Sequence, residues 1–238
     1  MTSPKQILET ATGQKRTVLS EYESKQFLSA YQIPVTREFP VHSESELIRA
    51  TNEIGYPLVL KGCSEDILHK TEQNLVRVDI RNDPEAKFVF KEIMAVLNRG
   101  GGAVLVQELL KGQRELVMGM ARDPQFGVSV MFGLGGIFTE IFEDVAFRLA
   151  PLDKRDARDM MEEIRGRRIL ENIRGMGAAD LDQVGEILIQ VGRIGIEHDI
   201  IKEIDINPVI ISEGKGIAAD ALIVLEPNSH GNLGNQQP

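Results

Sequence analysis

Cysteine and long apolar runs are scarce in this sequence. The 238 residues contain one cysteine, Cys63. A single thiol excludes an internal disulfide and the clustered thiolates of a structural zinc site, so a reducing compartment is the simplest expectation. No apolar segment approaches the roughly 18 residues of a membrane span, and the N-terminus shows no signal-peptide pattern. The sequence therefore predicts a cytoplasmic protein that does not enter a membrane.

Basic charge is also in short supply. The net charge is −9, and the chain has no long basic run. Proteins that bind nucleic acid usually carry a basic surface, so this balance argues against a nucleic-acid partner. Apolar residues make up 42% of the chain and charged residues 26%, which is ordinary for a globular protein with one large or two small domains.

The two commonest nucleotide-binding loops are missing as well. The stretches "GLGGIF" and "GMGAAD" begin like the dinucleotide-binding fingerprint, but Phe138 and Asp180 stand where its third glycine belongs. The chain contains no G-x-x-x-x-G-K-[ST] either. A nucleotide site in this protein therefore has to use a different arrangement.

Helix starts are the clearest local signals that the sequence does contain. Ser20 and Glu23 have the spacing of a capping box, and Ser43 and Glu46 repeat it before a helical apolar pattern that stops at Gly55. Further helices are expected from about residue 83, from about residue 153 and over about 180–198. Strands are expected in "PLVLK", "LVRVDI", "AVLVQELL", "ELVMGMA" and "GVSVMFGLGG", and in a closing hairpin of "IIKEIDINPVIIS" with "GIAADALIVL".

This order of elements predicts an α+β (mixed α/β) fold with a break near residues 102–112. We expect an N-terminal subdomain over 19–104 and a strand-rich C-terminal subdomain over 105–226. Residues 1–18 and the polar tail 227–238 are aperiodic, so we expect both to be loose ends.

The stretch "KEIDINPVI" carries the densest group of polar side chains. Because alternate residues of a strand share a face, Glu203, Asp205 and Asn207 point one way and Ile204 and Ile206 the other. The pattern is typical of a solvated acidic face, but it also suits a site that binds a cation.

The expected hairpin brings one more carboxylate to this face. If the chain turns at Gly214-Lys215, Asn207 faces Leu222, and Asp220 is its diagonal neighbour. One carboxylate, one amide oxygen and ligand phosphates are a usual set of partners for Mg²⁺. The pair of Asn207 and Asp220 is therefore a candidate magnesium site.

Four further positions have both a functional and an ordinary interpretation. Lys61 ends the apolar run "PLVLK", where it either contacts a phosphate or marks the strand reaching the surface. Arg148 in "FRLAP" is a second phosphate clamp or a surface residue. Gly135-Gly136 either turn backbone N–H groups toward an anion or form a tight loop. Gln107-Glu108 lie at the break, where a hinge could offer backbone groups to a ligand.

Several of these stretches together resemble one known family. "GYPLVLK", "SEDILHKT", "RDPQFGVSVMFGLGGIFTEIFEDVAFRLAPL" and "KEIDINPVI" are similar to the ATP-grasp β subunit of NDP-forming acyl-CoA synthetases, such as ADP-forming acetate–CoA ligase. The similarity runs from about residue 20 to 225. It implies a two-lobed ATP-grasp fold that holds ATP or ADP, with Mg²⁺, in a cleft between the lobes.

The resemblance also implies roles for individual residues. Lys61 corresponds to the lysine on the nucleotide phosphates, Asp205 to an acidic catalytic residue, and Arg148 to a residue of the phosphate-side segment. The remaining implied positions are Glu108 and Leu109 beside the adenine, Glu115 on the ribose, Gly135 and Gly136 near the phosphates, and Asn207 and Asp220 on nucleotide-bound magnesium.

His69 in "DILHK" matches a histidine that is transiently phosphorylated on a loop in that family. The resemblance implies a separate α subunit, in an α2β2 assembly, that binds CoA and carries a first phosphohistidine. A carrier is needed because acyl and nucleotide sites on different subunits cannot touch, and neutral imidazole is a competent nucleophile near pH 7.

Two alternatives stay open at this point. The chain could be the subunit of a succinate-type or other ATP-grasp ligase, although "DILHK" is not expected there. It could also be a non-catalytic nucleotide-binding regulatory lobe. The second alternative draws on "HKTEQNLV", in which Glu72 and Asn74-Leu75 replace an aspartate and a glycine pair that relatives usually carry.

Overall fold

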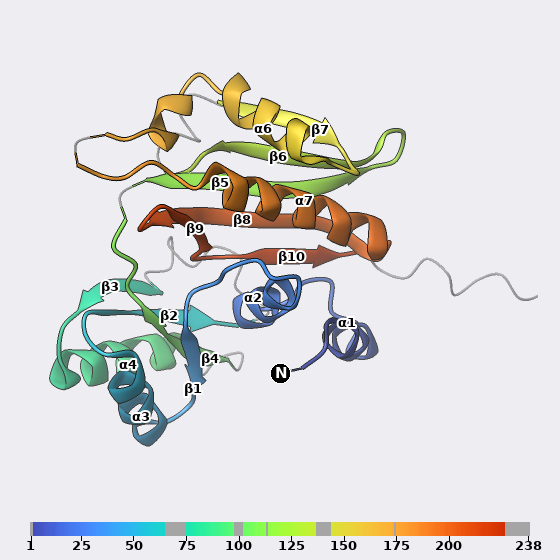
Figure 1. Ribbon diagram of the computed structural model, residues 1–238. Helices are drawn as coiled ribbons and strands as arrows, with labels where there is room; N and C mark the ends of the chain where they lie inside the picture. Colours follow the sequence, from blue (N-terminus) through green and yellow to red (C-terminus); the bar gives the residue numbers. More distant parts are fainter. Residues whose placement is uncertain are drawn as a thin grey trace, which may run out of the picture.

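The chain folds into two β-sheets, each covered by helices on one face (Figure 1). The computed structural model describes residues 2–64, 75–97, 102–112, 114–136, 144–173 and 175–226. The predicted mixed α/β class is confirmed. The predicted tail 227–238 and the loop with His69 lie outside the described residues.

The smaller sheet has four strands, and every neighbouring pair is antiparallel. Across the sheet the order is β1 (Glu38–Val41), β4 (Ala103–Glu108), β2 (Leu58–Cys63) and β3 (Val76–Ile80). Helices α3 (Glu44–Ile54) and α4 (Asp83–Leu97) pack side by side on one face. Their apolar faces and the buried strands form the core of this small lobe.

The larger sheet has six antiparallel strands. Its order is β10 (Leu222–Leu225), β8 (Ile201–Ser212), β5 (Glu115–Asp123), β6 (Gly127–Leu134) and β7 (Val145–Leu149), with β9 (Lys215–Ala218) paired to β8. The helices α6 (Lys154–Glu163) and α7 (Leu181–Glu197) cover one face of the sheet of this large lobe, and the short 3-10 helix η1 (Arg167–Leu170) lies between them in sequence.

The two predicted capping boxes mark real helix starts. Helix α2 (Glu21–Ala30) begins after Ser20, whose hydroxyl accepts the Glu23 N–H at 3.3 Å. The Glu23 carboxylate in turn accepts the Ser20 N–H at 2.9 Å. Ser43 caps α3 by accepting the Glu46 N–H at 3.3 Å, whereas the Glu46 carboxylate accepts the N–H of His42, and the helix ends at Gly55 with φ of 84°. These starts were predictable because the partners are three residues apart.

The expectation that residues 1–18 form a loose end is wrong for most of that segment. Helix α1 (Pro4–Gly13) begins after Ser3, which forms a capping box with Gln6. Ile7 and Leu8 are buried and belong to the core of the large lobe. The helix is held by this apolar stripe, which is too short to stand out in the sequence.

The border between the lobes also differs from the predicted one. Strand β4 pairs with β1 and β2, so the small sheet continues to Glu108 and the predicted border at 104/105 falls inside a strand. Helix α2 precedes the small sheet in sequence, yet its Phe27 and Leu28 are fully buried in the core of the large lobe. The first 30 or so residues thus return to the large lobe, because that is where their apolar side chains are buried.

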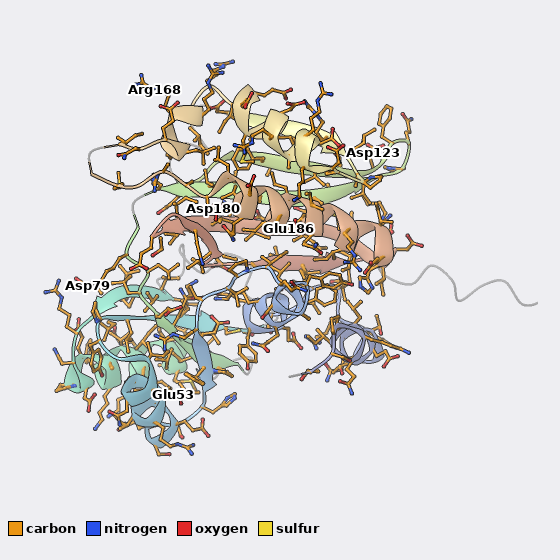
Figure 2. All side chains as sticks on the ribbon, viewed as in Figure 1. Glu53, Asp79, Asp123, Arg168, Asp180 and Glu186 are labelled. Carbon is orange, nitrogen blue, oxygen red and sulfur yellow. The ribbon has the colours of Figure 1, made fainter. Side chains whose placement is uncertain are left out.

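Charged side chains lie over the outside of both lobes. Figure 2 labels Glu53 on α3, Asp123 on β5 and Glu186 on α7, and all three are exposed. Of the helices within the described ranges, none is both long and apolar enough to cross a bilayer. The buried charges between the lobes are therefore exceptions that need a physical explanation.

Removing the buried part of α1 should destabilise the whole protein. For Leu8→Ala we expect the free energy of unfolding to fall by about 2–4 kcal/mol, because a buried leucine leaves a cavity. Denaturant titration measures this. The neighbouring exposed change Glu9→Ala is the control, with an expected effect within about 0.5 kcal/mol. Equal, small effects of both changes would mean that α1 does not pack on the core.

Candidate functional site

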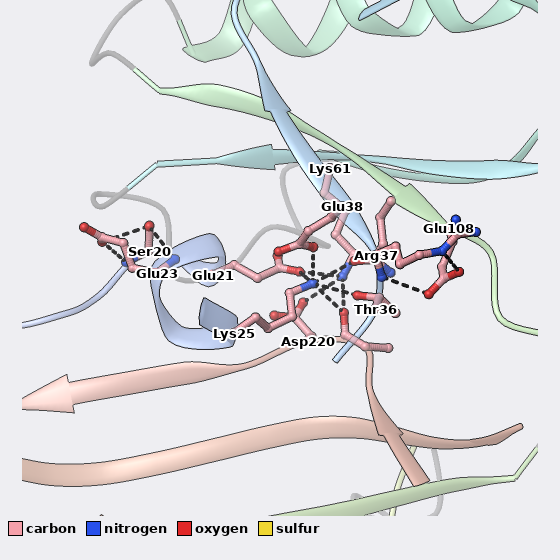
Figure 3. A network of polar contacts seen from close by, with 12 residues as sticks. Ser20, Glu21, Glu23, Lys25, Thr36, Arg37, Glu38, Lys61, Glu108 and Asp220 are labelled. Carbon is pink, nitrogen blue, oxygen red and sulfur yellow. Dashed lines mark hydrogen bonds and ion pairs between the residues drawn. The ribbon is translucent and has the colours of Figure 1, made fainter. Parts of the chain in front are cut away.

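Two lysines from different lobes meet on one buried carboxylate (Figure 3). Glu21 of α2 accepts hydrogen bonds at Oε1 from Lys25 Nζ and from Lys61 Nζ, each at 2.8 Å. The side chains of Glu21 and Lys25 are fully buried, and that of Lys61 is 7% exposed. Buried charges are costly unless they are paired, and here one oxygen serves two cations.

Lys61 lies within buried strand β2 and not where the strand reaches the surface, so that simpler interpretation of its position is wrong. Besides Glu21, its ammonium group donates to the Ala219 carbonyl at 2.8 Å and to Asp220 Oδ2 at 3.4 Å. Burial lowers the pKa of Lys61, but Glu21 and Asp220 outweigh this effect and hold the pKa above its ordinary value. Lys61 is therefore a cation at physiological pH.

Lys25 was not identified from the sequence. In addition to Glu21, its ammonium group contacts Glu38 of β1 and donates to Gln107 Oε1 of β4 at 2.9 Å. It also donates to Thr36 Oγ1 and to the Ala219 carbonyl, both at 3.2 Å. The sequence showed only Glu21 and Lys25 four residues apart on a helix, a spacing that is equally typical of a solvated surface pair.

Glu38 shows the cost of burying a carboxylate here. Burial raises its pKa to about 7; the Lys25 ammonium opposes the shift, and Glu21 adds to it. Glu38 Oε1 is buried and has no hydrogen-bond partner among the residues that the structure describes.

The acidic face predicted on β8 is present. Ile204 and Ile206 are buried under the helices, whereas Glu203, Asp205 and Asn207 alternate with them on the other face. Burial, together with repulsion from Glu203 and from Asp220, raises the pKa of Asp205 to about 6. Negative charge is thus concentrated on this face.

The hairpin after β8 turns one residue earlier than predicted. Glu213 and Gly214 form the turn with φ of 50° and 84°, and Ser212 pairs with Lys215. Two positive φ values are the mark of the tight two-residue turn that suits the strand twist. The prediction that the chain turns at Gly214-Lys215 is therefore wrong.

This change of register brings the candidate metal ligands closer. Asp205, and not Asn207, lies opposite Leu222. Because Val209 lies opposite Ala218 in the same register, Asn207 and Asp220 fall opposite each other instead of diagonally. The strand pairing is interrupted between Ala218 and Leu222, but its register is the same on both sides, so Asn207 and Asp220 lie at the same level of the sheet.

The chemistry of these groups fits a hard divalent cation. Asn207 is exposed, and the Asp220 side chain is 31% exposed, so an amide oxygen and a carboxylate face solvent together. Within the described residues no group of three or more His, Cys, Asp or Glu side chains is arranged to hold a metal ion. The site thus suits an ion that takes its other ligands from water or phosphate, as Mg²⁺ does.

The connection between the lobes begins at the residues predicted for the hinge. Glu108 ends β4, and Leu109 starts the segment that leads to β5. Both Glu108 carboxylate oxygens accept hydrogen bonds from Arg37, one from its backbone N–H at 2.8 Å and one from Nε at 2.9 Å. The Glu108 side chain is therefore fixed beside Arg37.

Glu115 and the glycine pair are brought together at the start of β5. Gly135 donates its N–H to the Glu115 carbonyl at 2.8 Å. A Cβ atom on Gly136, which has φ of 63°, would lie 2.5 Å from Glu115 Oε2. A Cβ atom on Gly135 would lie 2.8 Å from the Glu115 backbone carbon, and Gly136 has a positive φ, so both positions favour glycine and pack beside Glu115.

Arg148 lies beside helix α6 and, within the described part of the chain, forms no hydrogen bond or ion pair with the other candidate site residues. It shares a face of β7 with buried Ala146, toward the helices, and forms a two-pronged ion pair with Glu163 of α6. Its exposed neighbours Phe147 and Leu149 occupy the other face. A catalytic role for Arg148 stays a prediction, as does the role of His69.

A two-lobed fold with a buried lysine facing an acidic strand between the lobes defines the class of protein. The family model described as an ATP-grasp domain matches residues 10–225, so this chain is an ATP-grasp protein. Acetate–CoA ligase [ADP-forming] I subunit beta of Pyrococcus furiosus is 41% identical over 226 residues, which cover 93% of this chain and 97% of that relative. The chain belongs to the family of β subunits of ADP-forming acetate–CoA ligases, as the sequence motifs predicted.

Two solved structures of the dinucleotide-forming acetyl-coenzyme A synthetase 1 of Ca. Korarchaeum cryptofilum share this fold. One contains coenzyme A and Mg-AMPPCP, with its phosphohistidine segment pointing towards the nucleotide-binding site. It has a TM-score of 0.83 and 39% identity, covering 94% of this chain and 100% of that chain. The other contains coenzyme A, acetyl-coenzyme A and a phosphorylated phosphohistidine segment in the site I orientation. Its TM-score is 0.84, with 39% identity and the same coverage.

The raised pKa of Glu38 should make stability depend on pH. The folded protein binds the Glu38 proton up to a pH of about 7, whereas the unfolded chain loses it near the ordinary value of 4.5. Stability contributed by this proton is therefore complete below pH 4.5 and is lost as the pH rises to about 7. Relative to Glu38→Gln, the unchanged protein should lose unfolding free energy across this window in denaturant titrations.

The matched control is Glu9→Gln, which removes an exposed carboxylate from α1. This variant should follow the unchanged protein through the same pH window. Parallel curves for the unchanged protein and Glu38→Gln would contradict the expectation.

Proposed function

We propose that this chain is the nucleotide-binding subunit of an ADP-forming acyl-CoA synthetase. The reaction converts acyl-CoA, ADP and phosphate into the free acid, ATP and CoA, and it is reversible. The observation that carries the proposal is the contact of Lys61 with Asp220, which in turn raises the pKa of Asp205 on the acidic face of β8. The identity to acetate–CoA ligase subunits supports acetyl-CoA as the first substrate to test.

In this proposal the nucleotide lies between the lobes. Backbone groups of Glu108 and Leu109 face the adenine, because the Glu108 side chain is held by Arg37. Glu115 binds the ribose hydroxyls, and Gly135-Gly136, which pack against Glu115, lie on the phosphate side of it. Lys61 supplies the positive charge for the phosphate oxygens.

Asn207 and Asp220 would hold a nucleotide-bound Mg²⁺. When bound, the ion neutralises phosphate charge. In the free protein Asp220 repels Asp205 and raises its pKa. A cation held by Asp220 would weaken this repulsion. The solved relative that contains Mg-AMPPCP supports a magnesium-bound nucleotide in this family.

Lys61 is prepared to exchange one contact when nucleotide arrives. An ammonium group has three N–H donors, and those of Lys61 have three acceptors in the free protein. The contact with Asp220 is the longest of the three, at 3.4 Å, and Asp220 is the most exposed partner. We infer that Lys61 gives up Asp220 for a phosphate oxygen, which leaves the Asp220 carboxylate for the metal.

His69 carries the phosphoryl group in the proposed reaction. In the direction that consumes ATP, a neutral ring nitrogen of His69 attacks the γ-phosphorus of ATP, the N–P bond forms, and the P–O bond to ADP breaks, so that ADP is the leaving group. Asp205 accepts the N–H of the other ring nitrogen and so orients the imidazole. The two segment orientations in the solved relatives support a carrier that travels between sites.

The proposal includes a partner. The relatives named as β subunits imply an α subunit, and we infer that it binds CoA and the acyl phosphate in a cytoplasmic α2β2 assembly. The nucleotide site on this chain and the acyl site on the partner are then separate, which makes the carrier necessary.

The experiment combines this chain with its α subunit and supplies ATP labelled at the γ-phosphate. We expect acid-labile, base-stable label on His69. We also expect loss of turnover with acetate and CoA in His69→Ala, while Mg-ADP binding to the free chain is retained. His42→Ala removes an exposed histidine from the small lobe and serves as the control with normal turnover.

Two outcomes would contradict the proposal. Full turnover of His69→Ala would remove the carrier role. Mg-ADP binding without label or turnover, across a panel of acetate, branched, aryl and succinate substrates, would favour a regulatory nucleotide-binding lobe instead.

A further inference from the structure

A second lysine, Lys25, lies directly beside the proposed phosphate lysine. It shares two acceptors with Lys61, namely Glu21 Oε1 and the Ala219 carbonyl. Neither the sequence motifs nor the role of Lys61 in the proposed function accounts for Lys25.

Lys25 cannot contact a ligand itself. Its side chain is fully buried, and its three N–H donors face five acceptors within the protein. Lys61 differs in both respects, because its side chain is 7% exposed and its longest contact is to the part-exposed Asp220. Lys25 is therefore a cation with fixed partners, whereas Lys61 can exchange one partner for a ligand.

The contacts of Lys25 join the two lobes behind Lys61. The lysine belongs to α2, which packs in the core of the large lobe, and it reaches across to Glu38 of β1 and Gln107 of β4 in the small sheet. It also contacts the Ala219 carbonyl, one residue before the proposed metal ligand Asp220. Lys25 thus holds the small sheet, which carries Lys61, next to the segment that carries Asp220 (Figure 3).

The shared acceptors give Lys25 a direct influence on Lys61. The Glu21 oxygen divides its negative charge between two ammonium groups in the unchanged protein. Without Lys25, Lys61 has no second ammonium group competing for Glu21 Oε1, so this oxygen holds Lys61 more strongly, away from a phosphate. The Ala219 carbonyl also loses one of its two ammonium donors and with it a constraint on the neighbouring Asp220.

We propose that Lys25 is a positioning residue that sets the place and the availability of the Lys61 ammonium group for nucleotide phosphate. This inference rests on the proposed function, in which Lys61 contacts the phosphates. Lys25 acts through Glu21 and the Ala219 carbonyl and has no contact with nucleotide.

A double-mutant cycle on the full chain tests this inference, with Mg-ADP affinity measured by isothermal titration. Coupled residues give effects that do not add, whereas independent ones add. We expect Lys25→Met to weaken binding by about tenfold in the unchanged protein and by less than about twofold in the Lys61→Met background. A general loss of stability would weaken binding equally in both backgrounds.

The outcomes separate this inference from the proposed function. Equal effects of Lys25→Met in both backgrounds would overturn the positioning role and leave the function intact. Unchanged affinity in Lys61→Met would overturn the phosphate role of Lys61, and the positioning role would fall with it.

Controls deal with charge and folding. Lys5→Met makes the same chemical change at an exposed lysine of α1 and should leave Mg-ADP affinity unchanged. If Lys25→Met does not fold, Lys25→Met/Glu38→Gln takes its place in the cycle, because it removes both charges of the buried pair together. We expect this double variant to weaken Mg-ADP binding in the otherwise unchanged protein and to have little effect in the Lys61→Met background. Equal effects in both backgrounds would overturn the positioning role.

Discussion

One carboxylate oxygen shared by two buried ammonium groups is the interaction on which the arrangement between the lobes depends. Glu21 Oε1 lies 2.8 Å from both Lys25 Nζ and Lys61 Nζ. The side chains of Glu21 and Lys25 are fully buried. Removing one member of a buried ion pair costs about 3–5 kcal/mol, because the remaining charge is left without a partner in a poorly solvated place. The pairing therefore restricts how α2 and β2 can be placed relative to each other.

This restriction explains how elements far apart in sequence form one site. Helix α2 is part of the large-lobe core, and its two charged residues reach the small sheet at Lys61, Glu38 and Gln107. The Ala219 carbonyl connects the same group to the segment before β10. In this chain these contacts give the proposed nucleotide site a buried support, whereas Asp220 is its part-exposed member.

The features that the sequence could predict are those set by local rules. The starts of α2 and α3 follow from Ser20 and Ser43, whose capping partners are three residues away. The polar face of β8 follows from strand alternation, but the partner of Asn207 does not. A turn placed one residue too late moves that partner from Asp220 to Leu222. Lys25 was missed because its acceptors come from residues 36–38, 107 and 219, which no local pattern relates to α2.

The central claim is that Lys61 keeps its buried acceptors and exchanges only Asp220 when nucleotide binds. A crystal structure of this chain with Mg-ADP tests it directly. We expect Lys61 Nζ to remain at its present 2.8 Å from Glu21 Oε1 and from the Ala219 carbonyl. We also expect a phosphate oxygen to replace the 3.4 Å contact with Asp220, while Asp220 and Asn207 bind the metal ion. A bound nucleotide whose phosphates lie away from Lys61, with the Lys61–Asp220 contact intact, would contradict the account.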